Sequence, residues 1–194
     1  RTRGRGTLEP MPVFYQHRVN TLAAVRALTP GLGLEFDVRD TAGRLVVTHD
    51  PFTEGPPLDE FLALASGRPL IVNVKSDGID GAVLTALEAA GARDFFLLDC
   101  AAPTLVRLVV RGEHRVAVRW SEWEPAAALE PFRGRAGWLW VDCFTTYPGD
   151  AATWRDLAAD FRICLVSPEL QGHGLDAIPR FRDALADRPF HAVC

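Results

Sequence analysis

The run GLEFDVRD, residues 33–40, carries two carboxylates two positions apart. As a strand, this run would project Glu35 and Asp37 from one face and its apolar residues from the other. Two carboxylates about 6–7 Å apart on a buried face are costly unless a cation joins them. Carboxylate oxygens are the ligands that Mg²⁺ and Ca²⁺ prefer. The pair therefore indicates a divalent-cation site, provided that this face of the strand is enclosed and not simply solvated.

Two histidines, His17 and His49, follow other short apolar runs. Histidine is the side chain best suited to moving protons near neutral pH. Further polar side chains end the remaining apolar runs, namely Asn73, Lys75, Asp99, Arg119 and Asp142. Taken alone, Asp99 or Asp142 could cap a helix, and Lys75 could lie on the surface. Their joint occurrence at the ends of successive runs favours one shared site.

Lys75 has a second distinction. It is the only lysine among the 21 basic residues, because the other twenty are arginine. Such a bias is typical of GC-rich coding, under which most lysines drift to arginine. Lys75 therefore marks a position at which lysine itself is needed.

The elements that position these residues alternate along the whole chain. We expect strands at 13–17, 32–38, 69–75, 95–99, 115–120, 138–142, 162–167 and 190–194. We expect helices near 20–28, 57–66, 79–91, 103–111, 123–130, 150–160 and 174–187. Eight alternations are the pattern of a compact (β/α)8 TIM barrel, in which the C-terminal strand ends converge on one mouth. A doubly wound open sheet is the alternative. We also expect an extra strand at 44–50, after the turn signal DTAG, which would form a small hairpin-like excursion following the second barrel strand.

Length and composition suit a globular protein. The 194 residues allow one domain, placed at 11–194, preceded by a flexible or artificial tail over residues 1–10. A net charge of −4 argues against nucleic-acid binding, and no stretch has the apolar length of a membrane span. The four cysteines lack zinc-type spacing, which indicates reduced core thiols in a cytoplasmic protein. The sequence leaves the oligomeric state open.

Three short motifs resemble the signature of the glycerophosphodiester phosphodiesterases, a (β/α)8 family. They are HRVNT at 17–21, EFD at 35–37 and THD at 48–50, and their order, spacing and strand placement agree with the family. Later stretches such as VNVKSDGID, FFLLDC and WVDCF resemble a compact bacterial subgroup of this family, within the phospholipase C-like phosphodiesterases. The resemblance extends over nearly the whole chain.

The resemblance assigns roles to the motif residues. It implies an acid–base pair, a metal site for Mg²⁺ or Ca²⁺, and fixed positive charge beside the phosphate. The residues in these roles are, in turn, His17 and His49, Glu35 and Asp37, and Arg18 and Lys75. The chemistry suits these residue types independently, because a phosphodiester transition state gains charge on its non-bridging oxygens and exchanges two protons.

Strand three departs from the family pattern. Members commonly carry Glu-x-Lys there, whereas this chain has NVK, so Asn73 would ligate the metal through its carbonyl oxygen without bringing charge. Other polar or aromatic residues near later strand ends could bind substrate or supplement the metal ligands, namely Asp99, Arg119, Trp120, Glu122, Asp142 and Glu169. The first loop is also shorter than in the family, since Val19 leads directly into Asn20. An open mouth is the expected consequence.

The sequence thus predicts a metal-dependent phosphodiesterase. It would hydrolyse a glycerophosphodiester-like or other small or lipid-derived phosphodiester to a phosphomonoester and an alcohol by histidine acid–base catalysis. Two alternatives stay open. One is a non-catalytic barrel that binds a phospho-ligand, and the other is a lyase that forms a Schiff base on Lys75.

Overall fold

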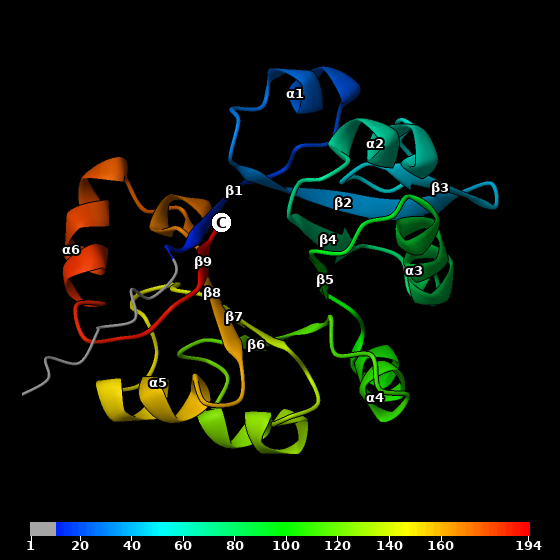
Figure 1. The fold of residues 1–194 in the computed structure, drawn as a ribbon. Coiled ribbons are helices and arrows are strands. Elements are labelled where there is room, and N and C mark those ends of the chain that lie inside the picture. The colour runs from blue at the N-terminus through cyan, green and yellow to red at the C-terminus, as the bar shows by residue number, and fades with distance from the viewer. Residues whose placement is uncertain (1–10) are drawn as a thin grey trace, which may run out of the picture.

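The computed structural model describes residues 11–194 and consists of one sheet with its connecting helices (Figure 1). The strands are β1 Val13–Gln16, β2 Gly33–Thr41, β3 Arg44–Val47, β4 Leu70–Val74, β5 Phe95–Leu98, β6 Ala117–Trp120, β7 Trp138–Val141, β8 Arg162–Leu165 and β9 Ala192–Val193. The structure therefore confirms a strand at each of the eight expected barrel positions, with β3 as the ninth strand. The expectation for residues 1–10 lies outside the described residues.

The eight parallel strands form a nearly closed ring. Their order is β5-β4-β2-β1-β9-β8-β7-β6, and a single parallel bridge between Leu97 and Val116 joins β5 to the start of β6. At this junction the Leu97 N–H donates to the Arg115 carbonyl at 2.8 Å. The predicted TIM barrel is confirmed. The alternative of a doubly wound open sheet is wrong, because the two outer strands meet.

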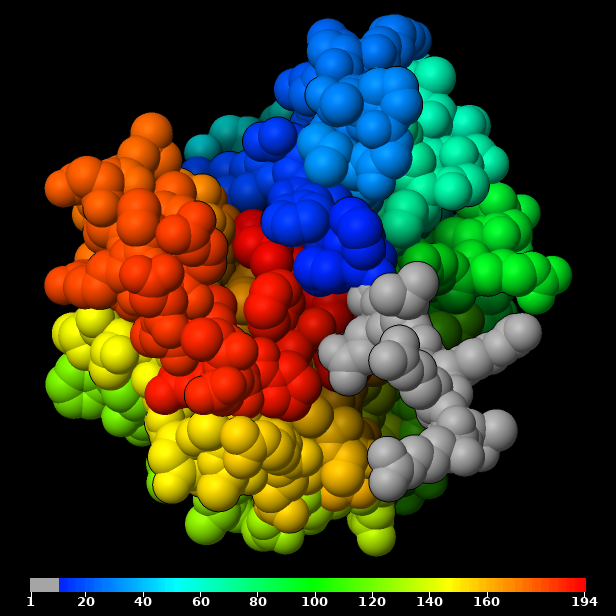
Figure 2. All heavy atoms as spheres, turned by 60° about the vertical axis from the view of Figure 1, so that its left-hand side comes forward, coloured from blue at the N-terminus to red at the C-terminus, as the bar shows by residue number. Residues whose placement is uncertain are grey.

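The first and last strands are neighbours in this ring. Val13 pairs with Ala192, and Phe14 pairs with Val193. Figure 2 shows the consequence on the surface, where blue residues from the start of the described chain lie directly against red residues from its end. The last residues thus complete the barrel that the first residues begin.

Helices surround the barrel (Figure 1). They are α1 Leu22–Ala27, α2 Leu58–Ala65, α3 Asp80–Ala89, α4 Ala102–Val110, α5 Ala151–Leu157 and α6 Ile178–Asp183, with 3₁₀ segments η1 Ala126–Phe132, η2 Pro168–Gln171 and η3 Leu175–Ala177. Two expected helices need correction. The α-helix expected at 123–130 is the 3₁₀ segment η1, which follows Pro125 and contains Pro131, a residue with no N–H for an α-helical bond. The helix expected at 174–187 is divided into η3 and α6.

The excursion after strand two is a β-hairpin. Strand β2 runs on to Thr41 and pairs antiparallel with β3, with Val38 opposite Val47 and Thr41 opposite Arg44. Ala42 and Gly43 form the turn with φ values of 51° and 76°, the left-handed backbone that two-residue hairpin turns require. The hairpin returns the chain to the barrel, so that the segment containing His49 begins beside the end of β2.

Strand alternation divides the core into two apolar clusters. One lies between the strands and the helices. The other fills the barrel interior and includes Tyr15, Ile71, Phe96, Trp138 and Trp140. The Phe96 and Trp138 rings stack there with centroids 4.5 Å apart. Large aromatic side chains thus fill the barrel below the strand ends, which leaves the top layer for polar residues.

The cysteines and the helices agree with two further expectations. All four cysteines are free; Cys143, Cys164 and Cys194 are buried, and Cys100 is half-buried. They therefore belong to the core, as the sequence predicted. Within residues 11–194, no helix has the length and apolarity that crossing a membrane requires.

Gly33 makes room for the interior aromatic cluster. A Cβ atom on Gly33 would lie 2.5 Å from Tyr15 Cδ1 and 2.9 Å from the Pro69 carbonyl oxygen. We therefore expect Gly33→Ala to destabilise the protein by about 1–3 kcal/mol through overpacking, measured by urea denaturation. Gly81→Ala in α3 is the matched control, because nothing lies within 4 Å of its added Cβ. Equal free energies of unfolding for the two variants would refute the tight contact.

Candidate active site

The polar strand ends surround a cavity of about 330 Å³ in the mouth of the barrel. Seven of the predicted site residues line it, namely His17, Glu35, Asn73, Lys75, Asp99, Arg119 and Asp142. The same wall contains Leu98, Trp140, Phe144, Val166, Leu170 and Gln171. The predicted convergence of the strand ends thus produces one cavity with an acidic and basic wall and an apolar floor.

Glu35 and Asp37 are both buried, with 1% of each residue exposed. Glu35 Oε2 accepts the Arg18 backbone N–H at 2.7 Å, and Glu35 Oε1 accepts from Asn73 Nδ2 at 3.1 Å. Asn20 binds Asp37 twice: its Nδ2 donates to Asp37 Oδ2 at 2.7 Å, and its Oδ1 accepts the Asp37 N–H at 2.9 Å. Burial, followed by the charge of Asp37, raises the pKa of Glu35. The pair is held in place by neutral donors that compensate its charge only in part.

Asn73 completes a set of oxygen atoms at this point. Its register places it beside Asp37 on the neighbouring strand, and only 6% of the residue is exposed. Its Oδ1 is buried without a hydrogen-bond partner in the described structure. A buried polar atom of this kind calls for a partner, such as a bound ion or an ordered water. Two carboxylates and one unpartnered amide oxygen are hard ligands that fit Mg²⁺ or Ca²⁺.

No group of three His, Cys, Asp or Glu side chains within residues 11–194 is placed to hold a metal. Asn73 on β4 is not one of these four residue types. The third oxygen comes from Asn73, which is an amide. Two carboxylates and one neutral oxygen therefore form the candidate ligand set.

The first βα loop brings His17 and Arg18 to the acidic pair. Arg18 has a left-handed φ of 58°, and the turn directs its N–H to the Glu35 side chain while the Val19 N–H donates to the Glu35 carbonyl at 2.8 Å. His17 Nε2 lies 3.7 Å from Glu35 Oε2. Burial, followed by the charge of Arg18, lowers the pKa of His17 in spite of the nearby Asp37. The imidazole is thereby kept neutral near pH 7.

His49 reaches the site from the hairpin side. Its Nε2 lies 2.8 Å from Arg18 Nη2, and its Nδ1 lies 2.7 Å from Asp50 Oδ1. Because a guanidinium can only donate, Nε2 must accept; a neutral ring then carries its proton on Nδ1 and donates it to Asp50. Arg18 therefore links His49 to the loop that carries His17.

An alternating chain of charges extends from Asp37 across the mouth. Lys75 Nζ lies 3.6 Å from Asp37 Oδ1 and 3.2 Å from Asp99 Oδ2. Arg119 donates from Nε to Asp99 Oδ1 at 2.7 Å and from Nη1 to Asp142 Oδ2. Burial opposes ionisation of Asp99, but Arg119 and Lys75 outweigh it and lower the pKa of this carboxyl. The only lysine of the chain is thus held between two carboxylates.

Asp142 ends this charge chain on β7's side of the cavity. Its Oδ1 accepts from Gln171 Nε2 at 2.7 Å and from Trp140 Nε1 at 3.3 Å. Burial raises the pKa of Asp142, although Arg119 acts in the opposite direction. The residue is therefore a fully bonded anchor for Arg119.

Six predicted site residues are not among those that line this cavity. Arg18, Asp37 and His49 belong to the network of hydrogen bonds and ion pairs described above, whereas Trp120, Glu122 and Glu169 lie apart from it. Trp120 is buried and packs outward on Trp154, with ring centroids 5.4 Å apart. Glu122 accepts from the Thr145 hydroxyl at 2.8 Å and from neighbouring backbone N–H groups. Glu169 accepts from Ser167 at 2.5 Å. The structure therefore does not place Trp120, Glu122 or Glu169 on the wall of this cavity.

Other residues belong to the site although the prediction did not assign them a role there. Asn20 orients Asp37, Gln171 supports Asp142, and the partly exposed Phe144 lies on the rim of the cavity. Asn20 was part of the HRVNT motif, which was the available signal for it. Gln171 and Phe144 lie beyond strand ends, where strand alternation gives no information on side-chain direction.

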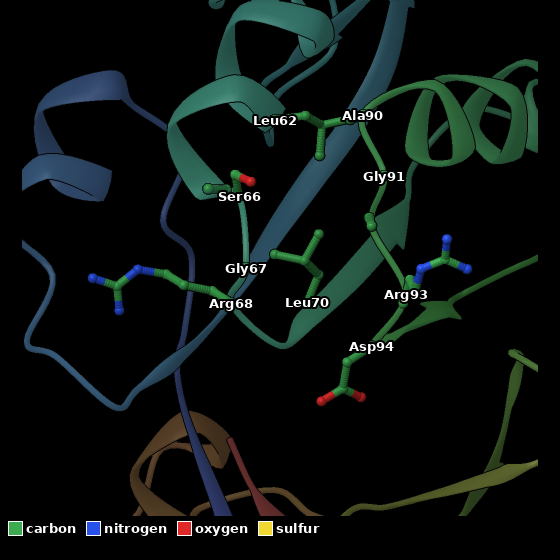
Figure 3. A pocket seen from close by; sticks show the side chains of 11 residues that line it. Leu62, Ser66, Gly67, Arg68, Leu70, Ala90, Gly91, Arg93 and Asp94 are labelled. Carbon is green, nitrogen blue, oxygen red and sulfur yellow. The ribbon is translucent and has the colours of Figure 1, made fainter.

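A second cavity, of about 280 Å³, lies at the opposite end of the barrel strands (Figure 3). Its polar wall includes Ser66, Arg68, Arg93 and Asp94. Arg68 donates to the backbone carbonyls of Thr29 and Leu32 at 3.1 and 3.0 Å, so this guanidinium has a structural role in holding the loop before β2. The cavity contains no histidine and no carboxylate pair, and the mouth is therefore the better candidate for chemistry.

The comparisons with known proteins concern the fold. No family model and no curated protein sequence matches this chain. A glycerophosphodiester phosphodiesterase from Agrobacterium tumefaciens superposes with a TM-score of 0.68 and 19% identity, covering 94% of this chain and 96% of that chain. One from Thermotoga maritima has a TM-score of 0.67 and 16% identity, covering 96% and 95%. A chain of the tryptophan synthase complex of Pyrococcus furiosus has a TM-score of 0.56 and 12% identity, covering 94% and 84%.

The fold is shared. At these identities the likeness establishes the TIM barrel over nearly the whole chain and leaves the chemistry to the residues of the site.

The raised pKa of Glu35 has a consequence for stability. A carboxyl whose pKa is raised by folding contributes most at pH below its ordinary value of 4.5, and this contribution is lost as pH rises through the folded-state value. We expect Glu35→Gln to raise Tm without metal at pH 7.5 by roughly 2–4 °C, which corresponds to about 1 kcal/mol for a chain of this size. The gain should vanish at pH 4. The exposed Glu54→Gln is the control, and calorimetry at both pH values is the measurement.

Proposed function

We propose that the protein is a metal-dependent phosphodiesterase, which hydrolyses a small or lipid-derived phosphodiester to a phosphomonoester and an alcohol. The observation that carries the proposal is the buried pair Glu35 and Asp37 beside the unpartnered Asn73 Oδ1, with His17 3.7 Å from Glu35. The likeness to solved glycerophosphodiester phosphodiesterases supports it at the level of the fold. The motifs at 17–21, 35–37 and 48–50 support a glycerophosphodiester-like substrate.

Glu35, Asp37 and Asn73 would hold Mg²⁺ or Ca²⁺ through their side-chain oxygens. A bound divalent cation at this position supplies Lewis-acid polarisation of a phosphoryl oxygen. The Lys75 ammonium lies beside Asp37, and the Arg18 guanidinium lies beside His49, so both would bring fixed positive charge to the non-bridging oxygens. Asp99 keeps the Lys75 ammonium at the cavity wall.

The two histidines divide the proton transfers. His17, neutral because of its lowered pKa, accepts the proton of the attacking hydroxyl group as the new P–O bond forms. His49 gives a proton to the leaving alcohol oxygen as the old P–O bond breaks. The attacking hydroxyl is that of water, or of the head group itself if a neighbouring hydroxyl first closes a cyclic phosphate.

Arg18 connects substrate binding to the protonation of His49. In the free protein, the Arg18 guanidinium occupies His49 Nε2, which therefore holds no proton. A phosphate in the mouth offers Arg18 a stronger, charged partner. Once Arg18 has turned to the phosphate, Nε2 is free to take up a proton from solvent and to pass it to the leaving group.

The catalytic assignment is tested with a chromogenic phosphodiester such as bis(p-nitrophenyl) phosphate. We expect hydrolysis with Mg²⁺ or Ca²⁺, its loss in EDTA, and a fall of about 10²–10⁴-fold in kcat for His17→Ala and for His49→Ala. His114→Ala is the control, because His114 is exposed at the other end of the barrel and should leave kcat unchanged. Since a base must be neutral, the acidic limb of kcat/KM assigned to His17 should lie below pH 6.5, with activity falling as pH drops through it. Activity that survives both EDTA and His17→Ala would exclude the mechanism.

The neutral third ligand makes a separate prediction. Asn73→Asp adds a third charge beside Glu35 and Asp37, so the variant should be less stable than wild type in EDTA and should bind the cation more tightly. We expect Tm to fall in EDTA and the rise in Tm on adding Ca²⁺ or Mg²⁺ to exceed that of wild type. Isothermal titration with the metal gives the affinity directly. An affinity equal to that of wild type would place the cation away from Asn73.

The two alternatives give different outcomes in these experiments. A non-catalytic phospho-ligand barrel would bind a phosphate ester without turnover, and its affinity would be unaffected by His49→Ala. A Schiff-base lyase would be trapped by borohydride at Lys75. The Lys75 ammonium is paired with two carboxylates, whereas Schiff-base lysines are commonly activated by apolar burial or by a neighbouring cation, so the phosphodiesterase is the better proposal. The cytoplasmic location stays a prediction based on the free cysteines.

A further inference from the structure

Arg39 lies on the same face of β2 as the metal-binding candidates. Residues 35, 37 and 39 alternate with apolar residues, so the three side chains follow one another toward the mouth. The Arg39 guanidinium makes two hydrogen bonds to backbone. Nε donates to the His49 carbonyl at 2.8 Å, and Nη1 donates to the Lys75 carbonyl at 2.9 Å. One side chain thus connects the segments that carry His49 and Lys75.

Both carbonyls lie just beyond the regular sheet. The Thr48 N–H donates to the Asp37 carbonyl at 3.0 Å, and the Lys75 N–H donates to the Val38 carbonyl at 2.9 Å. Among the described residues, these are the last backbone-to-backbone hydrogen bonds to β2 from the segments that leave β3 and β4. Carbonyl groups past this point have no strand partner, and the forked guanidinium of Arg39 provides one for each.

His49 depends on this anchor more than Lys75 does. Lys75 is also held through its side chain by Asp37 and Asp99. The His49 ring contacts Asp50, whose side chain is 72% exposed, and Arg18, which has to release it for the phosphate. When Arg18 turns away, the bond from Arg39 is the one that holds the backbone carbonyl of His49 itself, while bonds of Thr48 and Thr53 hold the residues on either side.

We propose that Arg39 is a positioning residue of the phosphodiesterase reaction, which holds the backbone of His49 at a fixed place relative to Lys75 and so keeps the acid aligned with the leaving group. The inference rests on the proposed function. Misplacing a catalytic group by about 1 Å can cost up to about 100-fold in rate. The loss of rate should appear in kcat and not in KM. Among the described residues, the Arg39 guanidinium hydrogen-bonds only to backbone carbonyls, and the side chains proposed to bind the phosphate are held by other residues.

The test compares three variants of the full chain. Arg39→Met keeps roughly the length of the side chain and removes its donors, and Arg39→Lys keeps the charge with a single ammonium. Arg44→Met is the matched control, because Arg44 is an exposed arginine of the same hairpin. With the chromogenic diester, we expect kcat to fall about 10- to 100-fold for Arg39→Met with KM within twofold of wild type. Arg39→Lys should recover part of the loss, and Arg44→Met should equal wild type. Assays run well below each measured Tm, so that loss of folded protein does not enter kcat.

A second measurement does not require turnover. The ¹H–¹⁵N correlations of the His49 ring report its tautomer and contacts in the substrate-free protein, and we expect them to change in Arg39→Met but not in Arg44→Met. Wild-type kcat in Arg39→Met, or unchanged ring signals, would overturn the positioning role. If wild type hydrolyses no diester, the proposed function fails. The ring signals then decide the anchoring of His49 on their own.

Discussion

The constraint on which the site depends is the burial of two carboxylates side by side. Glu35 and Asp37 are each 1% exposed, and their mutual repulsion is not screened by water. Four donors compensate part of this repulsion: the backbone N–H of Arg18, the side-chain amides of Asn20 and Asn73, and the more distant ammonium of Lys75. These donors come from two segments, the loop after β1 and the end of β4, so correct pairing of both strands with β2 is a condition for tolerating the pair. A site of this kind gives up stability for function, as preorganised active sites generally do.

The balance of charge in the mouth follows from the same pair. Glu35, Asp37, Asp99 and Asp142 bring four negative charges, and Lys75 and Arg119 bring two positive charges within the connected chain. The difference of two is the charge of one divalent cation. A phosphodiester adds one further negative charge. Arg18, whose guanidinium hydrogen-bonds only to the His49 imidazole among the described residues, is the cation available to pair with it. The substrate and its metal would therefore bring the mouth close to neutrality without any movement of Lys75 or Arg119 away from their carboxylates.

Strand alternation explains which parts of this arrangement the sequence could predict. It placed Glu35, Asp37 and the later strand ends on the inner face because a period of two fixes side-chain direction within a strand. The same rule excludes Trp120, since Arg119 before it already points inward. Glu122 and Glu169 lie beyond the ends of their strands, where loop geometry decides the side-chain direction and the alternation of the sequence does not predict it. The 3₁₀ segment in place of the helix expected at 123–130 reflects prolines that break the α-helical bonding pattern.

Arg39 shows a different limit of sequence reasoning. Its spacing from Glu35 and Asp37 is that of an inward-facing residue, but the strand was expected to end at 38, because the apolar alternation stops there. The strand continues to Thr41 since β3 pairs with it beyond the rim of the barrel, and such pairing is a tertiary effect. The chain of the tryptophan synthase complex has the same barrel at 12% identity, so the fold alone does not choose the chemistry. Under the proposed function, the chemistry is set by the hairpin that extends β2, because this hairpin brings His49 to Arg18 and supplies, in Arg39, a contact to the His49 backbone.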